Sequence, residues 1–195
     1  MNKIILDKER VINLDIKENS ICNIGEYYNI KELNVLLEDN VEFVINHYSE
    51  IIENDLKINI IQKNNSKFYY NHSFICSDLY KLDINIEMKG NNSKNNINIH
   101  GISDNGKSNI KVDGKVHEDT IDNELDENIR ILNMNEGQAY IYPNMFINTK
   151  NVVANHAASI TNISKDYLFY LNSKGIKDEE AINMIINGFL DNEAR

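Results

Sequence analysis

The sequence predicts a mainly β protein that ends in a short helical segment. Short runs of alternating apolar and polar residues occupy most of the chain, asparagine-rich clusters separate these runs, and a helical period replaces the alternation after residue 160. We therefore predict a β core domain over residues 1–160 and a C-terminal helical segment over residues 161–195.

The alternating runs predict half-buried strands. Roughly eight or more such strands fit before residue 155, and the stretch from Ile30 to Leu37 is the last helical candidate among them. Connections this short exclude a doubly wound α/β sheet. The inward-facing residues expected are Val41, Phe43 and Ile45; Leu56, Ile58 and Ile60; Leu82, Ile84, Ile86 and Met88; Ile97 and Ile99; Ile110 and Val112.

The asparagine clusters predict the turns between these strands. "KNNS" and "KGNNSKNN" have the composition of tight turns, in which asparagine tolerates a left-handed backbone. A sandwich, a barrel and a parallel β-solenoid all fit short strands joined in this way. Asparagine-rich turns at short intervals favour the solenoid, because like residues can stack between its coils, and the sandwich stays open as an alternative.

The C-terminal segment predicts two helices. Ser164 is the expected N-cap of a helix over "KDYLFYLNSK", and Gly175 is placed for a left-handed C-terminal turn. A second helix follows in "KDEEAINMIINGFL", whose acidic start suits the positive end of the helix dipole. A helix with this many apolar residues must pack against its own β domain or against a partner. Its apolar stripe comprises Ala181, Met184, Ile185, Gly188 and Phe189, widened by Ile182, Ile186 and Leu190.

Composition limits the classes of partner. The 195 residues include 20 Lys and Arg against 30 Asp and Glu, giving a net charge of -10, which argues against nucleic acid and against an anionic membrane surface. No run approaches the roughly 20 apolar residues of a membrane span, so we expect a soluble, cytoplasmic protein. Cys22 and Cys76 lack a CxxC pairing and are expected to be buried thiols.

Residues 101–108, "GISDNGKS", match the phosphate-loop pattern letter for letter. That loop binds phosphate only when it leads into a helix, whose free N–H groups hold the anion. Here "NIKVDGKV" alternates after Ser108, and the Asp113-Gly114 dipeptide predicts a turn that closes the run. We therefore predict a strand and a turn at this place, with no nucleotide site.

One of the five histidines has unusual surroundings. His47, His72, His100 and His117 are scattered without the HxxxH spacing of a helical metal site. His156 lies in "VVANHAAS", among small and apolar residues at the end of the β region, where an imidazole can be a metal ligand, an interface donor or a structural histidine. The acidic run from His117 to Asn128 is typical of a solvated face.

Residues 155–190, "NHAASITNISKDYLFYLNSKGIKDEEAINMIINGFL", closely resemble the C-terminal signature of the SufB/SufD family of iron–sulfur cluster assembly scaffolds. The match runs without gaps from a histidine and small residues, through an aromatic run and a Lys-Gly-Ile turn, to an Ala-Ile-x-Met-Ile-x-x-Gly-Phe helix. The matching residues are Leu168, Phe169, Tyr170, Lys174, Gly175, Ile176, Glu180, Ala181, Met184, Ile185, Gly188 and Phe189.

The resemblance implies a right-handed parallel β-helix and a subunit that is not an enzyme by itself. It implies a complex with a SufC-type ABC ATPase and a second SufB or SufD subunit, as a homodimer or heterodimer, with nascent clusters forming where the β-helices meet. It places His156 near that contact, as an iron or cluster-interface residue, with no cofactor held stably by this chain alone. Asn155 and Ala157 replace the glutamates that flank this histidine in SufB, so the chain is similar to a compact SufD type.

By the same resemblance the C-terminal helices dock the ATPase. Two other hypotheses remain open at this point: a β-helix enzyme acting on a polysaccharide through the acidic residues from Asp119 to Asp126, and an iron carrier or degenerate paralogue with only a structural or interaction role. The partner-binding residues expected are Tyr167, Phe169, Tyr170, Gly175, Ala181, Met184, Ile185 and Phe189.

Overall fold

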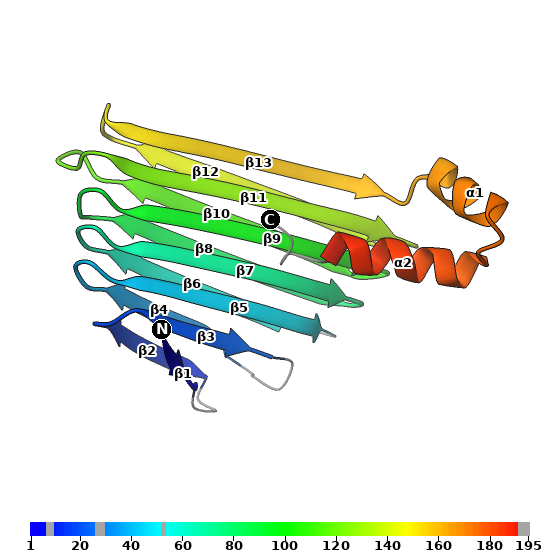
Figure 1. The fold of residues 1–195 in the computed structure, drawn as a ribbon, viewed down its shortest axis with the longest axis horizontal. Helices are drawn as coiled ribbons and strands as arrows, with labels where there is room; N and C mark the ends of the chain where they lie inside the picture. Colours follow the sequence, from blue (N-terminus) through cyan, green and yellow to red (C-terminus); the bar gives the residue numbers. More distant parts are fainter. Residues whose placement is uncertain (7–9, 26–29, 52–53, 191–195) are drawn as a thin grey trace.

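The chain folds into a parallel β-solenoid of about 5 turns, followed by two helices (Figure 1). The computed structural model describes residues 1–6, 10–25, 30–51 and 54–190. Strands make up 62% of it, and all the strand pairs are parallel, with each strand pairing the strand two positions further along the chain. This confirms the mainly β prediction and selects the solenoid over the sandwich, because sandwiches are built from antiparallel pairs.

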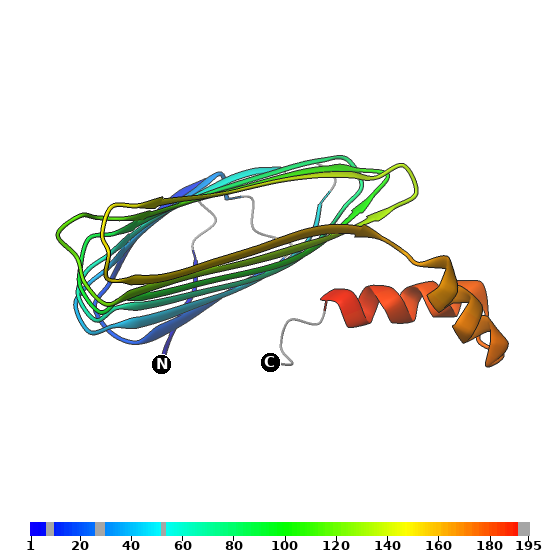
Figure 2. The same cartoon turned by 90° about the horizontal axis from the view of Figure 1, so that it is seen from above.

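Successive strands alternate between two facing sheets (Figure 2). We call them the odd sheet and the even sheet, after the strand numbers. The odd sheet contains, in spatial order, β1 (Asn2–Ile4), β3 (Ser20–Ile24), β5 (Glu42–Ile51), β7 (Lys67–Cys76), β9 (Lys94–Asp104), β11 (Asn123–Met134) and β13 (Val152–Asn162). The even sheet contains β2 (Val11–Ile16), β4 (Glu32–Leu37), β6 (Asn54–Gln62), β8 (Leu79–Met88), β10 (Lys107–Val116) and β12 (Gln138–Ile147).

The core fills the space between the two sheets. Every second residue of a strand points inward, and these rows are nearly all apolar and fully buried, as at Phe43, Ile58 and Ile84. Each such side chain contributes about 1.5–3 kcal/mol when it leaves water. The inward-facing residues that the alternation predicts are all in this core. The helical candidate from Ile30 to Leu37 is instead strand β4, because its alternate residues Leu33, Val35 and Leu37 fill the same core.

Left-handed residues form one edge of the solenoid, where the even sheet leads into the odd sheet. Asn40, Asn65, Asn92 and Asp122 all have φ between 54° and 62°. The N–H of each donates to a backbone carbonyl of the following coil, at 2.8–3.0 Å. Asparagine and aspartate adopt this conformation more readily than other side chains except glycine. The turns predicted at "KNNS" and "KGNNSKNN" are thereby confirmed.

Asparagine ladders run along the outer faces of both sheets. On the even sheet, the side-chain amides of Asn34, Asn59 and Asn85 each donate to the asparagine of the coil below, at 2.7–3.0 Å. Asn23, Asn46, Asn71, Asn98 and Asn128 align in the same way on the odd sheet. In-register parallel strands stack identical side chains, so each amide can bond to the next. These ladders account for part of the asparagine content of the chain.

The coils lengthen steadily along the chain. The aligned residues Asn23, Asn46, Asn71, Asn98 and Asn128 are separated by 23, 25, 27 and 30 residues in turn. The strands lengthen as well, from the 5 residues of β3 to the 12 of β11. The solenoid is therefore wider at its C-terminal end, as Figure 1 shows.

The stretch matching a phosphate loop forms the end of β9, a turn at residues 105–106 and the start of β10. The strand predicted after Ser108 is confirmed, and a helix N-terminus is not formed at this place. The turn predicted at Asp113-Gly114 is wrong, because β10 continues to Val116 in register with its two neighbouring strands. Gly114 is an inward-facing position of this strand, and the side chains of Leu125 and Glu127 occupy the place that its Cβ would take.

Two helices follow β13. Helix α1 (Lys165–Ser173) begins at the predicted N-cap, where the Ser164 side chain accepts a hydrogen bond from the N–H of Asp166 at 3.2 Å. Gly175 has a φ of 84°, as predicted, and turns the chain into α2 (Asp178–Leu190). Helix α2 lies along the outer face of the odd sheet (Figures 1 and 2). Within the residues described, neither helix is long and apolar enough to cross a membrane.

A candidate site at the open end of the solenoid

The last coil leaves one end of the solenoid open. Strands β12 and β13 each pair with a single strand, that of the coil below, so among the described strands nothing covers their outer edges. Ile160 is in register with the buried Ile131, yet it is 47% exposed because the coil stops above it. The exposed large apolar side chains of this coil are Tyr140, Tyr142, Phe146, Ile147, Val153 and Ile160.

His156 lies at this open end, on the inward-facing side of β13. It pairs in register with Glu127 of β11, and partners in a parallel sheet point to the same face. The imidazole is exposed because β13 is the edge strand. The structure thus places the predicted residue at the top of an interior row of side chains. That row is formed by Cys22, Ile45, Tyr70, Ile97, Glu127 and His156.

Glu127 is a carboxyl group enclosed in the solenoid core. It is only 2% exposed, and neither of its carboxylate oxygens has a hydrogen-bond partner among the described residues. Burial raises the pKa of this carboxyl group to about 8, and the negative charge of Asp113 adds to the effect. A glutamate in this state at neutral pH is mostly protonated. Its neighbours in the row are apolar except for His156.

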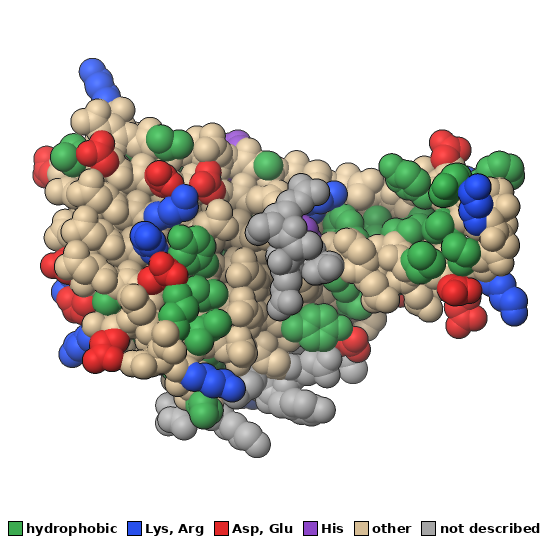
Figure 3. All heavy atoms as spheres, viewed as in Figure 1, with side chains coloured by type: hydrophobic (Ala, Val, Ile, Leu, Met, Phe, Trp, Pro, Cys, Tyr) green, Lys and Arg blue, Asp and Glu red, His purple; other side chains and the backbone are tan. Residues whose placement is uncertain are grey.

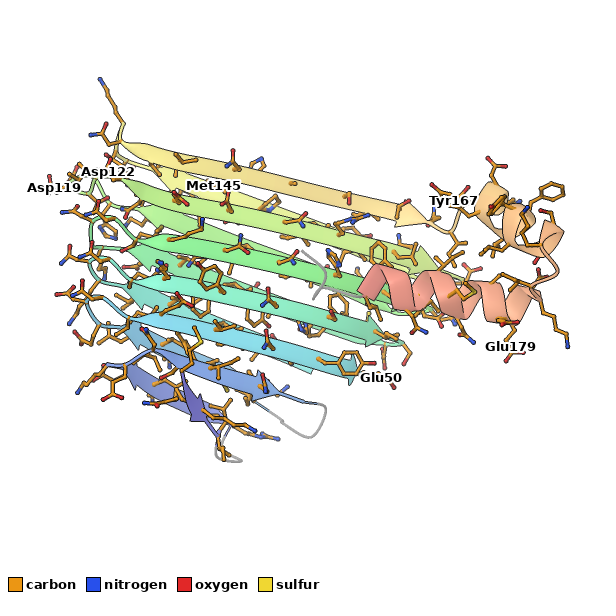
Figure 4. The ribbon with its side chains drawn as sticks, viewed as in Figure 1. Glu50, Asp119, Asp122, Met145, Tyr167 and Glu179 are labelled. Carbon is orange, nitrogen blue, oxygen red and sulfur yellow. The ribbon has the colours of Figure 1, made fainter. Side chains whose placement is uncertain are left out.

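The space around Glu127 comes from a glycine on the opposite sheet. A Cβ atom added at Gly114 would lie 2.9 Å from Oε1 of Glu127 and 2.5 Å from Cδ2 of Leu125. Met145, which follows Gly114 in the register of the even sheet, is half-buried against the core (Figure 4). Oε1 of Glu127 therefore lies next to the backbone of Gly114 on the opposite sheet.

Sequence reasoning missed Glu127. The composition of the acidic run from His117 to Asn128 predicts a solvated face, and most of its residues are exposed or half-buried. The signal was the phase of the alternation, because Glu127 stands between Leu125 and Ile129 at the inward-facing positions. A charged residue in the apolar phase of a strand is the pattern that would have found it.

The residues flanking His156 point the other way and have structural roles. Asn155 donates its side-chain N–H to Oδ1 of Asp126 at 2.9 Å, on the outer face of the odd sheet. Ala157 pairs with Asn128, the last residue of the asparagine ladder. The two positions where SufB-type chains are expected to carry glutamates thus lie outside the solenoid.

The helical segment carries a second apolar surface. Tyr167, Phe169 and Tyr170 on α1 and Met184 on α2 are exposed, with Phe169 at 76%. Among the described residues of α1 none is buried. Figure 3 shows apolar side chains gathered on this part of the molecule, and Figure 4 labels Tyr167. We call these four residues the helical surface.

The other predicted partner-binding residues are in different surroundings. Phe189 faces the odd sheet, with its ring 5.7 Å from the ring of His100 and 5.4 Å from the guanidinium carbon of Arg130. Ala181 is fully buried and Ile185 is half-buried. Gly175 forms the turn between the helices. Four of the eight predicted residues are therefore exposed on the two helices, whereas the Phe189 contact holds α2 against the odd sheet.

A second polar cluster inside the solenoid was also missed. The rings of His47 and His72 stack at 4.1 Å, and they contact the hydroxyl groups of Tyr70 at 2.9 Å and Tyr80 at 2.8 Å. Burial lowers the pKa of His72 to about 4 and that of His47 well below its usual value, so both rings are neutral. This cluster is a satisfied network within the core.

Cys22 and Cys76 are buried free thiols, as predicted. Burial raises the pKa of Cys22 to about 11, which makes it a poor nucleophile and a poor metal ligand at neutral pH. Within the part of the chain that the structure describes, no group of three or more His, Cys, Asp or Glu residues is placed to hold a metal ion.

The acidic residues of the polysaccharide hypothesis are spread over different places. Asp119 and Asp122 lie in the turn at the solenoid edge away from the helices (Figure 4). Glu124 forms an ion pair with Lys94 at 2.7 Å, and Asp126 accepts the bond from Asn155. These carboxylates do not face one another across a cleft, so the geometry does not favour paired acid and base catalysis.

Comparison with known proteins agrees with this architecture. Residues 25–189 match the family model described as the SUF system FeS cluster assembly, SufBD core domain. An iron–sulfur cluster assembly SufBD family protein of Staphylococcus saprophyticus is 37% identical over 57 residues, which are 29% of this chain and 12% of that protein. One of Mycobacterium tuberculosis is 36% identical over 50 residues, 26% of this chain and 6% of that protein.

The two kinds of match differ in extent. The similarity to the individual relatives covers only a small part of their length, whereas the family model covers most of this chain and includes β4 to α2. The predicted resemblance is thereby confirmed over the solenoid as well as over the C-terminal signature. The chain belongs to the SufBD family of the SUF system for iron–sulfur cluster assembly.

Proposed function

We propose that this chain is a non-catalytic scaffold subunit of an iron–sulfur cluster assembly complex. The open end of the solenoid contacts a second SufB/SufD-type subunit, and the helical surface docks a SufC-type ABC ATPase. The observation that carries the proposal is the exposure of Tyr167, Phe169, Tyr170 and Met184 on the C-terminal helices of a chain of this family.

The helical surface has the chemistry of a docking site. Large aromatic side chains lose little conformational entropy when they are covered and dominate the energetics of many interfaces. Three of them project from α1, a nine-residue helix without buried residues, so they contribute little to the fold. Burying these three aromatic side chains in an interface therefore favours formation of the complex.

The open end supports the proposed subunit contact. An exposed edge strand has backbone N–H and C=O groups ready to pair with another strand, and stable monomers usually protect such edges. Here two edge strands, β12 and β13, end the two sheets together, and the coil carries exposed apolar residues such as Tyr142 and Ile160. In this proposal His156 lies within the contact and handles iron or a nascent cluster as cargo.

Co-purification with the cognate ATPase tests the docking step. Phe169→Asp and Met184→Asp are expected to weaken binding at least about tenfold while leaving the β core folded, because both side chains are exposed. Val11→Asp, at an exposed apolar position of β2 in the first coil, is the control and should bind normally. If the wild-type chain forms no complex when both the ATPase and a SufB-type subunit are present, the proposal is wrong.

Size analysis by light scattering tests the subunit contact separately. Tyr142→Asp and Ile160→Asp place charges on the last coil and should prevent pairing with the second subunit. ATPase docking through the helical surface should survive these changes. Pairing that is unaffected by either charge would exclude the open end as the contact.

A further inference from the structure

Helices α1 and α2 meet at a bend (Figure 2), and one side-chain hydrogen bond crosses it. The side-chain N–H of Asn172, near the end of α1, donates to Oδ1 of Asp178, the first residue of α2, at 2.6 Å. We propose that Asn172 is a positioning residue, which fixes the angle between the two helices before a partner binds and so presents the aromatic residues of α1 for docking. This inference rests on the proposed function for the identity of the partner.

Helix α1 is not held in place by the β core. None of its residues is buried, and it lies beyond the ends of the sheets, whereas α2 runs along the odd sheet (Figures 1 and 2). Helix α2 is anchored there by the ring of Phe189 and by a hydrogen bond to the carbonyl of Leu190. Residues 163–164 join the other end of α1 to β13. The direction of α1 therefore depends on the connections at its two ends.

Backbone hydrogen bonds order the first half of the bend. The N–H of Gly175 donates to the carbonyl of Asn172 at 2.9 Å, and the N–H groups of Lys174 and Ile176 donate to the carbonyl of Leu171 at 3.0 and 3.3 Å. Gly175 has the left-handed conformation that commonly ends a helix. These bonds terminate α1, but none of them extends to α2, which begins two residues after Ile176.

The bond from Asn172 to Asp178 connects the two helices directly. Within the residues that the structure describes, no other side-chain hydrogen bond or ion pair joins α1 to α2. A carboxylate at the N-terminus of α2 is favoured by the helix dipole, and its charge strengthens the hydrogen bond that it accepts. Both residues are exposed, so the bond contributes little to the stability of the β core. Its effect is to restrain the rotation of α1 against α2.

A fixed angle between the helices favours docking because it lowers the entropy cost of binding. A segment that must be ordered on binding loses affinity, whereas a segment already held in its bound arrangement does not. When only a fraction of the chains has the binding arrangement, the apparent Kd rises by the inverse of that fraction. The side chains whose position depends on the bond are the exposed aromatic residues of α1, Tyr167, Phe169 and Tyr170.

Pulsed electron paramagnetic resonance on the full chain without a partner tests the positioning directly. Spin labels are attached at the exposed positions Lys165→Cys on α1 and Asn187→Cys on α2, while the native Cys22 and Cys76 are buried and inaccessible to the label. The distance distribution between the labels should be narrow in the otherwise unchanged chain and clearly broader when Asn172→Ala is added. Equal widths in the two proteins would overturn the inference.

Binding of the SufC-type ATPase to the unlabelled chain tests the consequence for docking. Asn172→Ala and Asp178→Ala should each weaken binding about threefold to tenfold, as expected for the loss of one hydrogen bond. The reversed pair, Asn172→Asp with Asp178→Asn, exchanges donor and acceptor. It should bind at least about threefold more tightly than Asn172→Asp alone, in which two carboxylates face each other. The control Asn2→Ala removes an exposed bond of 2.7 Å to the carboxylate of Glu18 in the first coil and should bind like the wild type.

The two measurements separate this inference from the proposed function. Wild-type affinity in Asn172→Ala, or a reversed pair that binds no better than Asn172→Asp, would overturn the positioning role even where the ATPase docks. If the wild-type chain does not bind the ATPase, the docking proposal is wrong, and the distance distributions still decide whether Asn172 fixes the angle. Thermal melting should give the same Tm for every variant, because both residues are exposed, and shows that the β core stays folded.

Discussion

Phe189 on α2 packs its ring 5.7 Å from the ring of His100 on β9, and this contact holds the second helix against the outer face of the odd sheet. The carbonyl of Leu190 accepts a hydrogen bond from Ser73 Oγ at 2.8 Å beside it. The helical segment is thus fixed to the solenoid near its C-terminal end, while the helical surface stays free for a partner.

Replacing Phe189 by alanine should release α2 without unfolding the solenoid. Loss of the half-buried ring is expected to cost about 1–2 kcal/mol locally and to speed hydrogen exchange of the α2 amides. Exchange in β7 and β9 should change little. Met184→Ala, on the exposed side of the same helix, is the control and should stay within about 0.5 kcal/mol of wild type. Equal exchange in both variants would contradict the role of the Phe189 contact.

Replacing Glu127 by leucine should stabilise the protein. With a pKa of about 8 in the fold and about 4.5 in the unfolded chain, the buried carboxyl group disfavours folding at pH 7 by up to about 3 kcal/mol. Leucine fits the apolar row, so we expect a gain of about 2 kcal/mol, which raises Tm by roughly 4–8 °C. Glu136→Leu, at an exposed turn, should leave Tm nearly unchanged. A lower Tm for Glu127→Leu would show that this glutamate is satisfied in the fold.

The interior histidines should make the protein sensitive to acid. The pKa of His72 is lowered to about 4, below its usual 6.5, so the unfolded chain binds the proton more readily. The free energy of unfolding therefore has its full value above pH 6.5. It falls by about 3 kcal/mol in total as the pH decreases toward 4, because the unfolded chain takes up a proton at His72 that the folded chain does not. A His72→Phe, Tyr80→Phe double variant removes the titrating ring together with its 2.8 Å partner.

Urea unfolding at pH 7.5 and pH 5 measures this effect. The free energy of unfolding should fall less between the two pH values in the double variant than in the wild type. Tyr142→Phe, on the outer face of β12, serves as the control. Identical pH dependence in all three proteins would mean that the pKa of His72 is not lowered in the fold.

Substituting an asparagine in the middle of a ladder should lower the free energy of unfolding more than substituting one at its end. Asn59 donates to Asn34 at 2.7 Å and to Glu32 at 3.1 Å, and it accepts from Asn85 at 3.0 Å. Asn59→Ala should therefore lose about 1–2 kcal/mol of stability. Asn13→Ala, which removes only the acceptor for Asn34, should lose about half as much. Equal losses at both positions, measured by urea unfolding, would argue against cooperation along the ladder.

The strands and the helix caps could be predicted because their causes are local. Alternation at Leu82, Ile84 and Ile86 fixes a strand and its buried face, and Ser164 with Gly175 fixes the ends of a helix. The Asp113-Gly114 turn was mispredicted because the dipeptide favours a turn locally, whereas pairing with β8 and β12 keeps the strand extended. Packing between coils overrode the local preference.

The candidate site could be predicted only in part. His156 was found from its sequence surroundings, but the residue paired with it on β11, Glu127, lies 29 residues earlier, and this pairing depends on the register of the two strands. The role of Phe189 likewise depends on the position of α2 against β9, which helical spacing does not give. Sequence alone separates the apolar face of a helix from its polar face, but not the side that packs from the side that stays free.

The increasing separation along the asparagine ladder, from 23 to 30 residues, gives the solenoid a direction. In repeat proteins whose units have equal lengths, a unit can be duplicated or removed and its neighbours still stack. Here most coils lie between a shorter and a longer neighbour, so the coils differ in size along the chain. The coils are therefore not interchangeable, because a duplicated or removed coil would bring strands of unequal length together.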